Sequence, residues 1–588
     1  MVVVGSGAAG ISVALTAAAA GLRVLVVTKD LVGGATPLAQ GGLAAALGMG
    51  DTPAAHVSDT LVAGAGLCEP EVAAALANGA PGAIGWLTGL GAQLDTRDLR
   101  LEGGHSARRI VHSGDDATGA EVHRTLLAAL LASEVEILDR SVALDLLLRD
   151  AGDEDGAGIS AGARIADGTA AANAGLGDAP GRELIPARPV FAAPGTGGRA
   201  PASAGNRAVA GLLAGTIGAD GRLTPGVLSA RAVVIAAGGL GQAFGTTSNP
   251  AGATGDGIAI AARAGAVIRD LEFVQFHPTV LWLPDASGQC PLITEALRGA
   301  GAVLRDLDGT PLMAGHDPRG DLAPRDVVAA RMAEVIAAGD AGHVWLDATE
   351  LGHDLLEEGF PTVTAACRKH GIDPVTAMIP VAPGAHYSCG GILADLDGRT
   401  SLPGLYAAGE AASTGVQGAN RLASNSVTEA IIAGRRTGTA IADALSRVGR
   451  AVEMTTSADE SSAYGNRGEV AKRRELAQAM SRYAGVMRDA EGLTELLRII
   501  AETGASPGSF AQKTPIEAAE SASAPLDLEE VEAANLRTVS LLIAAGARRR
   551  AESRGCHRRR DATGTAAAPW HTLAHWDGQR LVVSEEAL

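Results

Sequence analysis

The segment EGGHSARRIVH, residues 102–112, gathers side chains that could bind or transform a charged small molecule. It holds one carboxylate, two imidazoles and two guanidiniums beside the adjacent glycines Gly103 and Gly104. A solvated surface loop would also tolerate this composition, because charged side chains are mostly exposed. The segment alone leaves both interpretations open, and the rest of the chain has to decide between them.

The elements that must position such residues are clearest at the N-terminus. Apolar runs predict a strand over residues 1–4, an alanine-rich helix over 8–20 and a second strand over 24–27. The glycines between the first strand and the helix have the spacing of a dinucleotide-binding turn, Gly5-Ser6-Gly7-Ala8-Ala9-Gly10. In such a turn the first glycine allows the bend, the second lets a pyrophosphate approach the backbone, and the third lets the helix pack against the strand. The N–H groups of the helix N-terminus then face the phosphates.

Later segments favour a flavin over NAD as the dinucleotide. The second strand ends at Thr28 and Lys29, where an NAD site usually has the acid that binds the ribose. Residues 232–241 and 403–410 each predict a buried strand that runs into glycines, and Glu410 follows the last of them. Late strands of this kind close the sheet around FAD in two-part flavoprotein domains. We therefore predict an α/β fold with a Rossmann-like FAD-binding domain.

The composition indicates a soluble cytoplasmic protein of several domains. The 588 residues are too many for one core, since domains average about 150 residues. The net charge of −18 disfavours nucleic-acid binding, and no apolar run is long enough to span a membrane. The apolar start is broken by glycines and lacks a basic region, so it predicts no signal peptide. The five cysteines never stand as CxxC, which predicts reduced thiols and no metal site.

A series of motifs in chain order now shows a resemblance to a known family. Over most of residues 1–555 the chain is similar to the FAD-dependent family of succinate dehydrogenase and fumarate reductase flavoprotein subunits and L-aspartate oxidases. The motifs are GSGAAG (5–10), ATPLAQGG (35–42), TGDGIAIA (254–261), QFHPT (275–279), TEALRGAGA (294–302), APRD (323–326), HYSCGGI (386–392) and GANRLASNS (418–426). The chain begins almost on the first strand, which leaves a longer natural N-terminus open.

The resemblance implies a domain order. Residues 1–270 and 388–440 would form the FAD-binding domain, with an inserted α+β capping domain over 271–387 that closes over the flavin and excludes water. Residues 441–588 would form a C-terminal helical bundle. The alanine- and glycine-rich stretch at about 150–230 predicts a disordered or loosely folded insertion. The arginine triplets at 548–550 and 558–560 predict a solvated or channel-facing basic surface rather than a nucleic-acid site.

The family's flavin contacts can be carried over position by position. They fall on Gly5, Ser6, Gly7, Ala8, Ala9, Gly10, Lys29, Ala35, Thr36, Gln40, Gly41, Gly42, Asp256, Glu410, Ser426 and Val427. Respiratory members link the flavin to a histidine five residues before the glutamine of AQGG, and Ala35 holds that position here. The resemblance therefore implies noncovalent FAD. Ser426 and Glu429 have the spacing of a capping box, and the helix they begin would point its N-terminus at the flavin ring.

The opening segment separates the branches of the family. Respiratory members usually carry an aromatic residue before the double glycine, whereas the aspartate oxidases carry EGGHS, as residues 102–106 do. Aspartate and succinate share two carboxylates, so only the α-ammonium distinguishes them. A carboxylate at Glu102 would favour that cation by about 4 kcal/mol before desolvation, for ions about 4 Å apart at an effective dielectric near 20. We expect Arg108 and Arg109 to hold the loop rather than to bind substrate.

The remaining site residues follow from the same resemblance. The catalytic residues would be Arg325, His277 and His386, and the substrate-binding residues Glu102, Thr294, Glu295, Arg298 and Arg421. Arginine suits a dicarboxylate because its planar fork makes two parallel hydrogen bonds. Arg325 matches the arginine that donates a proton when the family reduces fumarate. Because arginine is a poor base, we expect an electrostatic role for it in the oxidation direction. Ala300 stands where many relatives have glutamate, which leaves a relay through that position in question.

The favoured function is oxidation of L-aspartate to iminoaspartate by hydride transfer from its α-carbon to flavin N5. This is the first step of de novo NAD biosynthesis, with oxygen or fumarate as electron acceptor and functional coupling to quinolinate synthase. One alternative is a soluble fumarate reductase or succinate dehydrogenase flavoprotein subunit, against which Glu102 and Ala35 argue. Another is a noncatalytic flavin-binding scaffold, in which substitution of Arg325 would leave activity unchanged.

Overall fold

The computed structural model describes residues 1–114, 116–150, 207–284, 286–446, 467–503, 526–576 and 580–588. Its central sheet is parallel and five-stranded, with the order β19-β10-β1-β2-β6. The strands are β1 (Val2–Val4), β2 (Leu25–Val27), β6 (Glu136–Leu138), β10 (Val233–Ile235) and β19 (Leu405–Ala407). The strands predicted from residues 232–241 and 403–410 thus complete the sheet that the N-terminus begins. The α/β prediction is confirmed.

The glycine turn joins β1 to α1 (Ala8–Ala19) under tight steric constraints. Gly5 has a φ of +107°, and a Cβ there would lie 2.3 Å from the Ala236 carbonyl oxygen. A Cβ on Gly10 would lie 2.0 Å from the Gly5 carbonyl oxygen, whereas one on Gly7 would meet only Thr36 Oγ1, at 3.3 Å. Gly5 and Gly10 are therefore required for packing, and Gly7 leaves open space beside the helix N-terminus.

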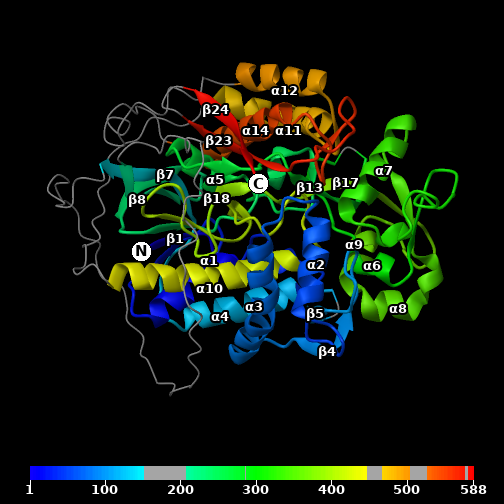
Figure 1. The fold of residues 1–588 in the computed structure, drawn as a ribbon, viewed down its shortest axis with the longest axis horizontal. Coiled ribbons are helices and arrows are strands. Elements are labelled where there is room, and N and C mark those ends of the chain that lie inside the picture. The colour runs from blue at the N-terminus through cyan, green and yellow to red at the C-terminus, as the bar shows by residue number, and fades with distance from the viewer. Residues whose placement is uncertain (115, 151–206, 285, 447–466, 504–525, 577–579) are drawn as a thin grey trace.

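The long helix α10 (Asn425–Ser446) lies along α1 (Figure 1). Two glycines make this close approach possible, because a Cβ on Gly434 or Gly438 would lie 2.6 Å from the Ala9 carbonyl or 2.8 Å from the Val13 carbonyl. Helices α2 (Pro53–Ala63), α3 (Pro70–Gly89) and α4 (Thr118–Leu131) lie at the same end of the molecule (Figure 1). A small sheet of β3 (Leu43–Ala44), β5 (Ile110–His112) and β4 (Asp95–Arg100) also lies there.

The capping region is built on a second, mixed sheet. It contains β11 (Thr246–Thr247), β13 (Val274–Leu281), β14 (Gly288–Gln289), β15 (Val303–Arg305), β16 (Val344–Asp347) and β17 (Ile379–Ser388). Helices α6 (Ala296–Gly299), α7 (Arg325–Ala338), α8 (Gly352–Gly359) and α9 (Pro361–Lys369) lie to one side of the molecule (Figure 1). The carboxylate of Asp116, before α4, accepts the backbone N–H groups of Thr362 and Val363 in α9 at 3.1 and 3.2 Å. This contact ties the capping region to the FAD-binding half.

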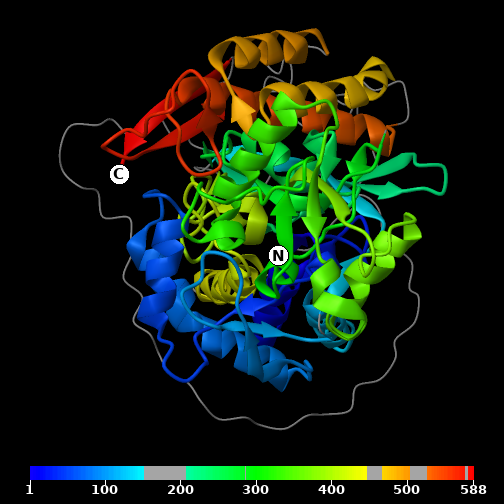
Figure 2. The same cartoon turned by 90° about the vertical axis from the view of Figure 1, so that its right-hand side faces the viewer.

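The C-terminal part combines helices with a hairpin. Helices α11 (Arg467–Tyr483), α12 (Ala490–Glu502) and α14 (Leu528–Arg549) pack together at the end opposite α2 and α3 (Figures 1 and 2). The strands β23 (Trp570–Trp576) and β24 (Leu581–Ala587) form a hairpin, and β23 extends a sheet through β12 (Ile268–Arg269), β18 (Gly391–Leu393) and β20 (Ala412–Ser413). The prediction of a helical region up to residue 588 is therefore wrong for these last residues, because β23 pairs with the otherwise open edge of β12. Across the described ranges, no helix is both long and apolar enough to span a membrane.

The predicted loose insertion is wrong at both of its described ends. Strands β7 (Ser141–Asp150), β8 (Arg207–Ile217) and β9 (Leu223–Ser229) form a continuous antiparallel sheet. Val209, Leu212 and Ala214 of β8 are buried in the main hydrophobic core. The small residues of this strand therefore pack against the core and do not form a loose segment. Residues 151–206 of the predicted insertion lie outside the described residues.

Candidate active site

The predicted cofactor residues follow the strands of the parallel sheet. Gly5 comes after β1, Lys29 after β2 and Glu410 after β19. Because the carboxyl ends of parallel strands meet at one edge, these residues share the edge at which α/β sheets bind ligands. Lys29 Nζ lies 2.8 Å from Asp256 Oδ2, at the start of α5 (Asp256–Arg263), and 2.7 Å from Glu532 Oε1 of α14. The structure thus brings the predicted residues Lys29 and Asp256 into direct contact.

Three features at this edge fit a dinucleotide such as FAD. Gly7 precedes α1 and offers no side chain of its own to cap the helix, and a helix N-terminus favours a phosphate. Ser6 Oγ lies 2.8 Å from Thr28 Oγ1, and Thr36 Oγ1 accepts the Ala8 N–H at 3.0 Å, so neighbouring side chains order the turn. Gln40 Oε1 is buried and has no hydrogen-bond partner among the described residues, which suits a ligand that carries a donor.

Two further cofactor positions have distinct chemistry. Ala35 stands directly before the short helix η1 (Thr36–Leu38) and carries only a methyl group, which cannot form a bond to a flavin. Glu410 is half-buried beside Gly239 and accepts the Ser388 N–H at 3.0 Å. Burial raises the pKa of Glu410 to about 7, although the Ser388 N–H opposes this shift.

The two predicted histidines face each other from paired strands. His277 lies on β13 and His386 on β17, and their ring centroids are 5.1 Å apart. His277 Nδ1 accepts the Thr279 backbone N–H at 3.2 Å, so its proton resides on Nε2. Burial, together with Arg325 for His277 and with Arg421 for His386, holds the pKa of each imidazole well below its usual value. Both rings are therefore neutral at pH 7, and they present hydrogen-bonding groups rather than cations.

Two predicted arginines converge on the side-chain amide of Gln275, a residue that was not among the predicted site residues. Arg325 Nη1 and Arg421 Nη2 each donate to Gln275 Oε1 at 3.2 Å. The Gln275 amide nitrogen donates in turn to the Arg421 carbonyl at 2.7 Å and to Asn420 Oδ1 at 2.8 Å. Gln275 therefore fixes the spacing of the two guanidiniums, and its place in QFHPT was the signal available in the sequence.

Glu295 joins the remaining cations of the site. Its Oε2 accepts from Arg325 Nε at 2.7 Å, and its Oε1 lies 3.3 Å from Arg298 Nη2. Burial raises the pKa of Glu295, but Arg325 and Arg298 outweigh it, so the net shift is downward. Arg298 also donates to the Asp321 carbonyl. Thr294 is buried beside this group and its hydroxyl accepts the Ala296 N–H at 3.4 Å.

Glu102, from the opening segment, lies in the same cluster and is only 3% exposed. Ser424 Oγ donates to its Oε2 at 2.6 Å, and a Cβ on Gly41 would lie 2.5 Å from its Oε1. Burial and then Glu295 raise the pKa of Glu102, while Arg325, Ser424 and Arg421 act in the opposite direction. The structure therefore rules out a solvated loop at this position and brings Glu102 to the predicted substrate residues.

The arginines of the opening segment stand apart from that cluster. Arg109 is fully buried and donates to both carboxylate oxygens of Asp51 at 2.9 Å, and its Nη1 lies 2.5 Å from Asp59 Oδ2. Arg108 is exposed and donates only to the Leu99 carbonyl, at 3.5 Å, among the contacts described. The prediction that these two residues hold the loop is confirmed for Arg109.

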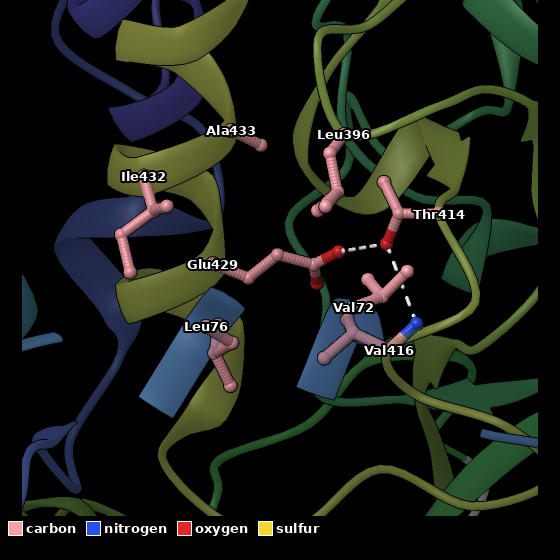
Figure 3. A pocket seen from close by; sticks show the side chains of 8 residues that line it. All are labelled: Val72, Leu76, Leu396, Thr414, Val416, Glu429, Ile432 and Ala433. Carbon is pink, nitrogen blue, oxygen red and sulfur yellow. Dashed lines mark hydrogen bonds between the residues drawn. The ribbon is translucent and has the colours of Figure 1, made fainter. Parts of the chain in front are cut away.

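The predicted capping box at the start of α10 is wrong. The helix begins at Asn425, and Ser426 Oγ accepts from Arg421 Nη1 at 3.0 Å. Glu429 instead lines a small, mostly apolar pocket beside α3, where Thr414 donates to its carboxylate at 2.7 Å (Figure 3). Gln417 also donates to this carboxylate, at 2.6 Å. Ser426 therefore orients the side chain of Arg421, and Val427 packs against the α1 core.

Comparison with known proteins extends over nearly the whole chain. The FAD binding domain family matches residues 1–427, and the fumarate reductase flavoprotein C-terminal family matches residues 473–586. The L-aspartate oxidase of Streptomyces coelicolor is 41% identical over 572 residues, which cover 95% of this chain and 88% of that protein. The L-aspartate oxidase of Mycobacterium tuberculosis H37Rv is 43% identical over 570 residues, which cover 95% of this chain and 92% of that protein.

Solved structures give the same picture of the fold. The FrdA chain of an E. coli quinol fumarate reductase variant aligns with a TM-score of 0.78 and 25% identity, covering 100% of this chain and 96% of that one. The Mycobacterium smegmatis Sdh1 complex aligns with a TM-score of 0.73 and 27% identity, covering 100% of this chain and 93% of the other. The capping region and C-terminal hairpin described above therefore belong to a shared architecture.

Proposed function

The chain belongs to the L-aspartate oxidase family of FAD-dependent oxidoreductases, and from this premise we propose that it converts L-aspartate to iminoaspartate with noncovalently bound FAD. The observation that carries the proposal is the buried carboxylate of Glu102 within a cluster of guanidiniums. Such a cluster binds carboxylates, and the added acid provides for an ammonium group. Of aspartate, succinate and fumarate, only aspartate has both carboxylates and an ammonium group.

The charge of the cluster supports an amino dicarboxylate over a simple one. Arg298, Arg325 and Arg421 face Glu102 and Glu295, so the five groups carry one net positive charge when all are ionised. Aspartate carries one net negative charge at neutral pH, and succinate carries two. A buried site favours a ligand that neutralises it. This balance supports aspartate as the substrate, with Arg421 as the bidentate partner of one carboxylate.

The neutral histidines complete the positioning of the substrate. With its Nδ1 occupied by Thr279, His277 offers an Nε2–H donor, and His386 is oriented by Ser248 Oγ at 2.7 Å from its Nδ1. We assign both rings to the substrate carboxylates. Arg325, held by Glu295 and Gln275, would stabilise negative charge near the reacting carbon rather than act as a base.

The cofactor contributes the redox chemistry. When bound, FAD supplies the acceptor for the hydride that the α-carbon of aspartate loses. The Gly5 to Gly10 turn would hold its pyrophosphate, and Gln40, Glu410, Ser426 and Val427 would contact other parts of it. The methyl group of Ala35 supports noncovalent binding.

The reaction would be the first step of de novo NAD biosynthesis. We propose oxygen or fumarate as the electron acceptor, and functional coupling to quinolinate synthase because iminoaspartate hydrolyses readily in water. The five cysteines, Cys68, Cys290, Cys367, Cys389 and Cys556, are all free thiols. Free thiols are typical of a reducing compartment, which supports the cytoplasm as the location.

A turnover assay tests this function. Purified FAD-loaded protein is incubated with L-aspartate, D-aspartate or succinate and an artificial electron acceptor, and oxaloacetate, ammonia and fumarate are quantified. We expect equal amounts of oxaloacetate and ammonia from L-aspartate, since these are the hydrolysis products of iminoaspartate. Turnover of succinate to fumarate in place of aspartate would move the protein to the respiratory branch of the family.

A further inference from the structure

Directly before α10 lies a serine with an unusual backbone and an unusual hydrogen-bond partner. Ser424 has a φ of +58°, a left-handed conformation that is uncommon for residues other than glycine. A serine that precedes a helix usually caps it. Here the buried hydroxyl instead donates to Glu102 Oε2 at 2.6 Å.

Contacts on both sides hold Ser424 in this conformation. Its carbonyl accepts the Ala44 N–H at 3.0 Å. The preceding carbonyl, of Ala423, accepts from His105 Nε2 at 2.9 Å, and Arg109 Nη1 donates to the other nitrogen of that ring at 3.3 Å. Glu102 and His105 of one loop thus form hydrogen bonds with two consecutive residues before α10, Ser424 and Ala423. These contacts hold the loop against the start of α10, and burial lowers the pKa of His105 to about 4, so its imidazole is neutral.

Glu102 depends on such a neutral donor because its charged neighbours conflict. Glu295 repels it, whereas Arg325 and Arg421 attract it, and Arg298 also lies within electrostatic reach. Arg325 and Arg298 are already engaged with Glu295. The Ser424 hydroxyl is a contact that stabilises the ionised form of Glu102 directly, since a carboxylate accepts a hydroxyl more strongly than a carboxylic acid does.

Resting on the proposed aspartate oxidation, we propose that Ser424 is a specificity-determining positioning residue, whose hydroxyl keeps Glu102 ionised and in place for the α-ammonium of an amino dicarboxylate. With Glu102 protonated, the five-group cluster would carry two net positive charges. That charge matches the two negative charges of succinate or fumarate. The Ser424 hydroxyl therefore favours amino dicarboxylates over simple dicarboxylates.

The Ser424→Ala variant tests this role, because it retains Cβ and removes only the hydroxyl. We measure kcat/KM for L-aspartate oxidation and for fumarate reduction by a reduced dye, from pH 6 to 9. Loss of a hydrogen bond to a charged group costs about tenfold or more. The Ser424 hydroxyl lowers the pKa of Glu102, so its loss raises that pKa and moves the acid limb of the aspartate profile to higher pH. Aspartate oxidation falls most at low pH and recovers as pH rises, while fumarate reduction is retained.

Ligand binding gives a second readout that does not require turnover. Calorimetry compares aminomalonate with malonate, two small dicarboxylates that differ by the ammonium group. We expect the preference for aminomalonate to fall about tenfold in Ser424→Ala. Ser424→Gly, which accepts the left-handed backbone without strain, should behave in the same way. Ser540→Ala is the matched control, since Ser540 is buried in α14 and its hydroxyl has no partner among the described residues.

The outcomes separate this inference from the proposed function. An equal loss of aspartate oxidation and fumarate reduction at every pH, or an unchanged binding preference, would overturn the role of Ser424. If the unsubstituted protein oxidises aspartate and the variants keep its specificity, only this inference fails. If the unsubstituted protein does not oxidise aspartate, the proposed function fails and the inference with it.

Discussion

At the scale of single residues, the site depends on acids and bases whose charge is set by burial and by one or two neighbours. Glu295 is stabilised as a carboxylate by Arg325 and Arg298, whereas burial pushes Glu102 and Glu410 toward the neutral form. The motifs could predict which residues gather, because each stands in a short conspicuous segment. They could not predict Gln275 as the bridge between Arg325 and Arg421 or Ser424 as the partner of Glu102, because these roles arise from contacts between distant segments.

Glu410 provides a pH-dependent prediction for cofactor binding. Its pKa of about 7 means that it is largely ionised at pH 8 and largely neutral at pH 6. A carboxylate accepts hydroxyl groups more strongly than the acid does, so we expect FAD to bind more tightly as pH rises through 7. The dissociation constant, measured by quenching of FAD fluorescence, should fall by up to about tenfold between pH 6 and 8. In Glu410→Gln the pH dependence should vanish, and an identical slope in this variant would contradict the assignment.

At the scale of elements, the glycine turn and α1 illustrate what a short pattern can predict. Their approximate boundaries, and the presence of the late strands β10 and β19 in the same sheet, follow from apolar runs and glycine spacing. The predicted capping box of α10 is wrong, because Ser426 accepts a hydrogen bond from Arg421 and Glu429 accepts hydrogen bonds from Thr414 and Gln417. Strand β8 was missed because its alanines and glycines resemble a loose segment, although its partners β7 and β9 order it.

The glycines of the turn should respond differently to the same substitution. Gly7→Ala adds a methyl group that meets only Thr36 Oγ1 at 3.3 Å, whereas Gly10→Ala would place one 2.0 Å from the Gly5 carbonyl oxygen. We expect Gly10→Ala to destabilise the fold by about 1–3 kcal/mol. Gly7→Ala should fold normally but bind FAD at least about tenfold more weakly, because its methyl group occupies the phosphate side of the turn.

Thermal denaturation of the apoproteins and FAD titration distinguish these two effects. The turn would not be the pyrophosphate site if Gly7→Ala bound FAD as tightly as the unsubstituted protein does.

At the scale of the whole molecule, buried ion pairs of Arg550 join the C-terminal region to the segment before β13. Arg550, just after α14, is fully buried and donates to Glu272 at 2.7 Å and to Glu552 at 2.8 Å, and it also lies 3.3 Å from Asp270. Glu272 and Asp270 lie just before β13 (Val274–Leu281), which carries His277. Of the two predictions for the arginine triplets, a solvated or a channel-facing basic surface, solvation is thus wrong for Arg550 and for the buried Arg559. Sequence could not show this, because one acidic partner of Arg550, Glu272, lies 278 positions earlier in the chain.

Removal of the Arg550 cation should therefore affect the entire fold. Arg550→Leu leaves Asp270, Glu272 and Glu552 without their shared partner, which typically costs about 3–5 kcal/mol. We expect a clearly lower denaturation midpoint. Arg498→Leu is the matched control, because Arg498 also pairs with two acids, Glu495 and Glu502, but at an exposed surface where ion pairs contribute little. Equal midpoints for the two variants would show that the buried network does not hold the C-terminal region in place.

The most direct test of the account is anaerobic reduction of the bound flavin. The purified yellow protein is mixed, without oxygen, with L-aspartate and separately with succinate, and the flavin absorption band is followed. If Glu102 binds the α-ammonium of the substrate, aspartate should bleach the band and succinate should not. Bleaching by succinate alone, or by neither compound, would contradict the assignment of this chain's site to aspartate oxidation.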